Sequence, residues 1–321
     1  MNARQQRQLY ESLVERFGRG IADAFSQAVQ SHADSIPMAE LVDAIDRGDI
    51  RALEMLLRFE QGAMFPLTEA IRSAFVGGGL SASTALGARF GFDGRNYRAE
   101  AWLRDNGGAL IEGIQSDTLQ MVRQVMDNRL VTGESGAKTA RSIVGTFNRA
   151  TGRREGGFLG LNSQQTDWVI NARSDLANLD ERYFTRKMRD KRYDRLVRKA
   201  IDEGKPLAQA DVDRIIWRYK DRLLKYRGDT IARTEAHKAT SAGTYEGMRQ
   251  AQEAGATITV RWIHGHSKEP RQGHLAAAQA PSRPLGMPFQ LENGSALYPH
   301  DPALPASEVV GCRCSAYYRV V

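Results

Sequence analysis

The sequence predicts an α+β fold in which a predominantly helical N-terminal and central region precedes a small mixed α+β C-terminal domain. Apolar residues recur at helical spacing through most of the first 250 residues. Near residue 260 the pattern changes to β-branched residues that alternate with polar ones. Residues 251–321 also contain seven of the ten prolines and four of the six histidines, which favours short strands and tight turns. We therefore expect helical regions over 1–94 and 95–250 and a C-terminal domain over 251–321.

Length, charge and cysteine content limit the class of protein. A chain of 321 residues can bury a large core, and size alone suggests about two domains. The net charge of +7 suggests an acidic partner such as nucleic acid or a membrane surface. We expect no signal peptide and no membrane span, because no apolar run has the required length. Two cysteines exclude a disulfide framework and favour folding in a reducing compartment.

The first elements are amphipathic helices. From about Ala3 to Ser31, apolar residues recur every four positions and form one stripe along a helix. Asp43 to Gly62 repeats this pattern. Gly77-Gly78-Gly79 then predicts a hinge or a loop, because glycine disfavours helix.

Three further helices are expected in the central region. The first extends from Tyr97 to Leu130 and is interrupted near Gly107-Gly108. The others cover Ser163 to Leu179 and Gln209 to Tyr226.

A dense basic segment lies between the last two of these helices. Residues 182–199 contain nine lysines or arginines against two aspartates, Asp190 and Asp194. Such a run can be a solvated helix face. It can equally contact phosphate groups or an acidic protein surface, which need dense positive charge. The candidate contacts to nucleic acid or to a partner protein are Arg182, Arg186, Lys187, Arg189, Lys191, Arg192 and Arg195.

The C-terminal region opens with a strand and closes with the only two cysteines. Thr257 to Ile263 has the period-two, β-branched pattern of a strand and includes Trp262. Cys312 and Cys314 are two positions apart, so in an extended segment their thiols face the same side.

Two interpretations of this ending remain open. Zinc requires four nitrogen or sulfur ligands, and His274, Cys312 and Cys314 supply three. His300, His264 or His266 could supply the fourth. Alternatively, the thiols pack as small apolar groups while His274 bonds a backbone carbonyl. A disulfide between the two cysteines would close a short, strained ring.

Three phrases in order identify a family resemblance. They are Ile231-Ala232-Arg233-Thr234-Glu235, then Trp262 followed by Arg271 and His274, then Leu297-Tyr298-Pro299 leading to Cys312-Arg313-Cys314. Together they resemble the phage Mu F-like minor head proteins, also called head morphogenesis proteins. The resemblance covers roughly residues 95–321 and is most specific after residue 227. The sequence departs from the family at Ser267 to Arg271 and at His300, where a glycine is usual.

The resemblance implies a non-enzymatic structural protein. Such a protein is made in the host cytoplasm and then lies inside the phage head near the portal. Its expected partners are the portal protein, the scaffold or major capsid protein, and double-stranded DNA, with no membrane partner. A role beside packed DNA agrees with the basic charge. The expected cofactor content is a structural zinc ion or none.

The arginine-threonine-glutamate phrase is expected to be architectural. Residues two positions apart on a helix do not face each other, so Arg233 and Glu235 should bond other elements. Arg233 is expected to bond a carboxylate or backbone carbonyls with both guanidinium arms.

Three alternative functions remain. One is an internal virion protein that binds DNA without a portal role. Another is an ADP-ribosyltransferase using Arg233, Gln290 and Glu292, although the serine-threonine-serine phrase of those enzymes is missing. The last is a zinc-dependent nuclease using His264, His266 and His274, for which no acidic general base stands at motif spacing.

Overall fold

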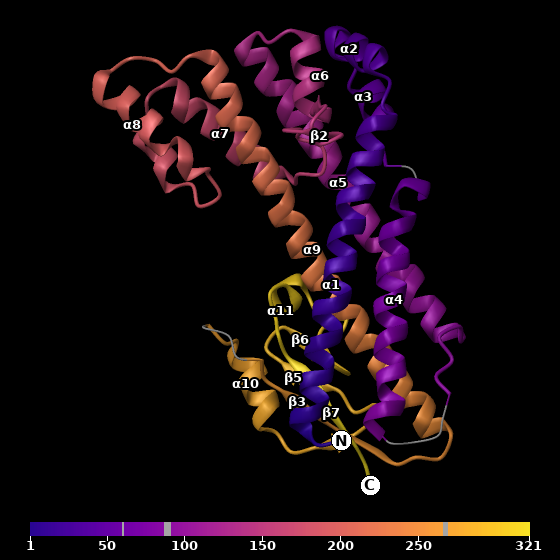
Figure 1. The fold of residues 1–321 in the computed structure, drawn as a ribbon. Helices are drawn as coiled ribbons and strands as arrows, with labels where there is room; N and C mark the ends of the chain where they lie inside the picture. The colour runs from indigo at the N-terminus through magenta and orange to yellow at the C-terminus, as the bar shows by residue number, and fades with distance from the viewer. Residues whose placement is uncertain (60, 87–90, 266–268) are drawn as a thin grey trace. The chain divides into compact units, whose positions relative to one another are not determined.

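The computed structural model describes residues 1–59, 61–86, 91–265 and 269–321 and confirms a mostly helical α+β fold (Figure 1). The helices and strands follow one another as α1 (Ala3–Ser35), α2 (Met38–Arg47), α3 (Ile50–Leu56), α4 (Gln61–Leu86), α5 (Tyr97–Thr132), α6 (Gly136–Val144), β1 (Thr146–Asn148), β2 (Arg153–Glu155), α7 (Ser163–Ala177), η1 (Glu181–Thr185), η2 (Lys191–Tyr193), α8 (Asp194–Glu203), α9 (Gln209–Glu253), β3 (Ile258–Ile263), α10 (Gln272–Gln279), β4 (Arg283–Pro284), β5 (Phe289–Leu291), β6 (Gly294–Ala296), α11 (Ala306–Val309) and β7 (Ser315–Val320). No helix of the described residues is long and apolar enough to cross a membrane.

The chain forms two compact units, and each is discontinuous in sequence. The first contains Met1–Phe25, Phe65–Ala109 and Gly228–Val321. The second contains Ser26–Met64 and Leu110–Arg227. The boundaries expected near residues 94 and 250 do not coincide with these units. Helices α1, α4, α5 and α9 continue through the unit boundaries, and each contributes residues to both cores.

The expected strand forms the centre of a small antiparallel sheet in the first unit. The strand order is β4-β3-β7, and Trp262 of β3 pairs with Ala316 of β7. Alternate residues of β3 are buried, and Trp262 is fully buried. Gln6 of α1 binds β7 through both ends of its side-chain amide. Its Nε2 donates to the Tyr318 carbonyl at 2.8 Å, and its Oε1 accepts from the Tyr318 N–H at 3.1 Å.

The hinge predicted at Gly77-Gly78-Gly79 is wrong, because all three residues lie inside α4. Gly78 allows the backbones of α4 and α9 to approach closely. A Cβ atom at Gly78 would overlap the carbonyl oxygen of Thr240. From the other side, a Cβ atom at Gly243 would overlap the carbonyl oxygen of Phe75. The glycines therefore mark a helix crossing.

Three other sequence-based boundaries also differ from the structure. Helix α5 continues through Gly107 and Gly108 without interruption. The helix expected from Asp43 to Gly62 is instead divided into α2 and α3 at Gly48, whose φ of +65° requires the left-handed conformation. The helix predicted over Gln209 to Tyr226 is part of a much longer helix, α9.

The helix crossing gives a direct test of the fold. Gly243→Ala should lower the free energy of unfolding by about 3 kcal/mol, because the added methyl meets backbone that cannot move aside. Gly20→Ala is the matched control, since its Cβ would contact nothing and alanine favours helix by about 1 kcal/mol. Urea unfolding of both variants checks this. Equal stabilities would show that the two helices can separate.

Candidate metal centre and charged surfaces

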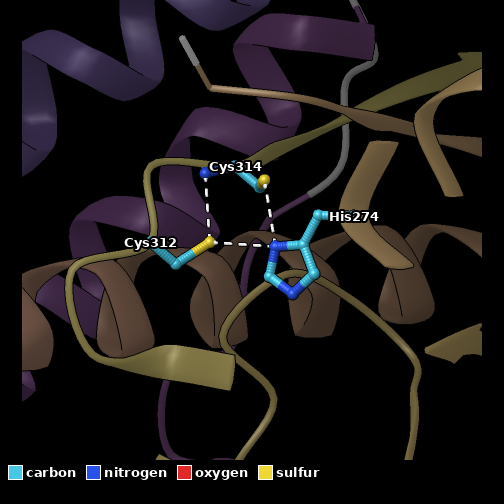
Figure 2. Close-up of side chains that lie close together, drawn as sticks. All are labelled: His274, Cys312 and Cys314. Carbon is cyan, nitrogen blue, oxygen red and sulfur yellow. Dashed lines mark hydrogen bonds between the residues drawn. The ribbon is translucent and has the colours of Figure 1, made fainter. Parts of the chain in front are cut away.

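Three buried side chains of the first unit converge from two segments. His274 lies on α10, whereas Cys312 and Cys314 lie just before β7. Figure 2 shows the two thiols on one side of the imidazole, and both Sγ atoms lie 3.5 Å from His274 Nδ1. The exposed fraction of each of the three residues is at most 5%.

The spacing of these donor atoms fits a tetrahedral metal ion. Ordinary Zn–S and Zn–N bonds of about 2.3 and 2.0 Å at tetrahedral angles place sulfur and nitrogen about 3.5 Å apart. The observed sulfur-to-nitrogen distances of 3.5 Å agree with this value. All three donor atoms lie within 4.8 Å of one another. The group can therefore bind a metal ion.

A buried carboxylate fixes the orientation of the imidazole. Glu308 Oε2 lies 2.8 Å from His274 Nε2. Its other oxygen accepts a hydrogen bond of 2.6 Å from Asn293 Nδ2. When His274 donates its Nε2–H to Glu308, the lone pair of Nδ1 points to the thiols. Carboxylate–histidine pairs of this kind are the usual outer shell of a metal site.

The surroundings of the thiols favour one negative charge on the pair. The backbone N–H of Cys314 donates to Cys312 Sγ at 3.4 Å. A hydrogen bond from Cys312 is the main reason that the pKa of the Cys314 thiol is lowered to about 4, against the effect of burial. The pKa of Cys312 is raised, chiefly because it donates to Cys314. Both cysteines are free.

Two of the histidines proposed as a fourth ligand, His300 and His264, lie outside this group. His300 Nε2 bonds the carbonyl oxygen of Cys314 at 3.1 Å, and its Nδ1 is buried without a partner in the described structure. His264 belongs to no metal-binding group of the described residues and makes another contact of its own. His266 lies outside the described residues.

Other motif residues surround the metal group. The Trp262 ring packs edge-on against His274, with 5.2 Å between ring centroids. Arg271 donates through Nη2 to the Val310 carbonyl at 2.8 Å, and its Nε lies 4.0 Å from Glu308. These contacts tie α10 to the segment that contains α11.

The members of the arginine-threonine-glutamate phrase face different surroundings on α9. Glu235 is buried and accepts hydrogen bonds from Asn106 of α5 and from Lys238, at 2.8 and 2.9 Å. Thr234 is half-buried in the wall of a cleft of about 500 Å³. Arg233 differs from the expectation, because it is exposed and has no hydrogen-bond or ion-pair partner among the described residues.

The basic segment of the second unit is not a single helix face. It folds as η1, η2 and α8, and four of its seven candidate arginines and lysines are paired with aspartates. Arg186 binds Asp175, and Arg189 binds Asp194. The other two pairs are Arg182–Asp180 and Arg192–Asp190.

The ion pairs divide the seven candidate residues into four that are paired and three that are not. Hydrogen bonds from Arg192 are the main reason that the pKa of Asp190 is lowered to about 2. Arg186 and Arg189 are largely buried, and they hold loops together. Lys187, Lys191 and Arg195 are exposed and form no ion pair with any described residue. Of the seven candidates, these three are the cations that no described carboxylate pairs with.

Sequence reasoning missed His237, which is buried one helical turn after Arg233. Its Nδ1 lies 2.8 Å from the Tyr10 hydroxyl of α1. Its ring stacks on His300 with 4.7 Å between centroids. Burial is the main reason that the pKa of His237 is lowered to about 4. The available signal was the spacing of Arg233 and His237, since residues four apart share a helix face.

Comparison with known proteins gives no relative. No family model, no curated protein and no solved structure matches the chain.

Proposed function

We propose that this chain is a structural minor head protein of the phage Mu F-like kind, stabilised by a zinc ion in its first unit. The observation that carries the proposal is the convergence of the motif phrases. Glu235, Trp262, Arg271, His274 and the two cysteines are far apart in sequence but belong to one compact unit. Contacts between buried groups, such as Glu235 with Asn106 and His274 with Glu308, suit a role in holding structure.

Zinc is the metal that the donor set favours. Two thiolates and an imidazole are the ligands of structural zinc sites. The buried Glu308 would raise the basicity of His274 and hold it in place. A bound ion would join α10 to the segment before β7 and so close the small domain.

Two observations bear on the enzymatic alternatives. Arg233 lines a cleft whose walls include neither Gln290 nor Glu292, so the three residues share no site there. His274 has both nitrogens engaged, one by Glu308 and one by the thiols. A structural function therefore has more support than an ADP-ribosyltransferase or a nuclease.

The second unit supports contact with DNA during assembly. Lys187, Lys191 and Arg195 are exposed and unpaired in the described structure, which suits binding to phosphates without sequence preference. In this function the protein assembles in the host cytoplasm with the portal and with the scaffold or major capsid protein. It then remains inside the head near the portal.

The zinc site predicts a metal content and a stability effect. The purified protein should contain near-equimolar zinc, and Cys314→Ser should lose the metal and lower the melting temperature. His300→Asn is the control, because His300 bonds a carbonyl and asparagine tolerates its φ of +70°. Elemental analysis with thermal melts checks this. Wild-type protein without zinc would contradict the metal site, and loss of zinc from His300→Asn would assign His300 as a ligand.

The assembly role predicts a specific partner. When the chain is co-expressed with the portal protein of the same genome, the two should co-purify at 150 mM salt or above, where surface charge is largely screened. A portal from an unrelated phage is the control. Mass spectrometry of purified virions should find the chain in the head fraction. Absence from virions together with no portal binding would contradict the role.

The DNA contact predicts a change in salt dependence. Replacing Lys187, Lys191 and Arg195 with glutamine should lower the slope of log affinity against log salt by about 2 to 3, because each neutralised phosphate contributes about 0.9. Replacing the exposed Arg141, Arg149 and Arg153 removes equal charge and should change the slope little. Fluorescence anisotropy with a labelled duplex measures both. Identical slopes would show that the basic segment is only a solvated surface.

A further inference from the structure

A cleft of about 630 Å³ opens on the first unit beside α9. Arg233 and His237 of α9 line it together with Arg313, which lies between the two cysteines. Cys312 and Cys314 face the metal group, and Arg313 faces outward because side chains alternate along an extended segment. The metal group and the cleft thus share one short segment of backbone.

Two of the three arginines that line this cleft, Arg233 and Arg313, form no ion pair with any described residue. Arg233 and Arg313 are exposed, and neither has an ion-pair or hydrogen-bonded side-chain partner among the described residues. Both are near enough to His237 to help lower its pKa by charge repulsion. Two guanidinium groups with free N–H donors can bind an anion through several hydrogen bonds.

Two carboxylates of the same cleft, Glu11 and Glu15, lie beside other arginines. Glu11 accepts from Arg7 at 2.8 Å, and Glu15 lies 3.7 Å from Arg19. Asp229 has a contact of its own. Neither Glu11 nor Glu15 forms an ion pair with Arg233 or Arg313, so the N–H donors of these two guanidinium groups remain available to a ligand.

His237 supplies a buried neutral donor. Burial raises the pKa of Tyr10, so this phenol keeps its proton. The Tyr10 hydroxyl can then donate to His237 Nδ1, which leaves the ring proton on Nε2. No described residue bonds Nε2, and His237 lines the cleft. The ring is held in place by its stack on His300.

We propose that Arg233, Arg313 and His237 form a binding site for a phosphate group. Arginine binds phosphate oxygens in pairs of parallel hydrogen bonds, and the neutral histidine adds one directed donor. The phosphate could belong to a nucleic-acid strand or to a free phosphorylated compound. This site lies in the first unit, whereas the basic segment lies in the second, so the proposal does not depend on the DNA contact described above.

The test measures binding of inorganic phosphate at constant ionic strength, by calorimetry or by ³¹P NMR. Arg233→Gln and Arg313→Gln should each weaken binding about tenfold, which is the loss of one charge-assisted contact. Arg319→Gln is the control, because Arg319 is exposed on β7 and lies outside the cleft. It should bind within twofold of the wild type. Melting curves and zinc content confirm that each variant is folded.

Competition separates the two sources of phosphate. If a 12-nucleotide single strand displaces phosphate from wild-type protein and less well from Arg313→Gln, the ligand is a nucleic-acid backbone. If pyrophosphate displaces it and the oligonucleotide does not, the ligand is a free phosphorylated compound. Phosphate binding that does not saturate, or that is equal in all three variants, would overturn the proposal.

Discussion

The antiparallel pairing of β3 with β7 is the interaction on which the first unit depends. It aligns Trp262 with Ala316 and so brings the residues just before β7 beside the end of β3. Gly265 allows this approach, because a Cβ atom there would overlap the backbone of Arg313. The same two strands thus determine where the thiols lie, where Arg313 emerges, and which side chain covers the metal group. The three features cannot be moved independently.

The local elements were predictable because their signals are periodic. The helices near residues 3–31 and 163–179 and the strand near 257–263 follow from apolar spacing alone. The glycines led to a wrong prediction of a hinge. Glycine indicates a break in a helix unless another helix is known to pack against it. Gly78 and Gly243 are needed because another backbone lies against each. The division into two discontinuous units was also not predictable. Long helices contribute to both cores, and their amino-acid composition does not change at the boundary between the units.

The candidate site was predictable to the level of its donor atoms. The spacing of Cys312 and Cys314 indicated a shared face, and the structure places His274 between them. Glu308 and Asn293 could not be found, because a single carboxylate or amide far along the chain carries no periodic signal. The prediction for the basic segment differed from the structure for another reason. Its charge was visible, but Arg186 binds Asp175 of α7, which the fold brings close, and Arg189 binds Asp194 of the segment itself.

The contact between Gln6 and Tyr318 has a consequence for synthesis. These residues are 312 positions apart, and each end of the Gln6 amide bonds the Tyr318 backbone. The first unit therefore cannot be completed until Tyr318 has left the ribosome. The second unit ends at Arg227, so all its residues are translated earlier. Because domains generally fold as their residues emerge, the second unit can form before β7 is available to bond Gln6 of α1.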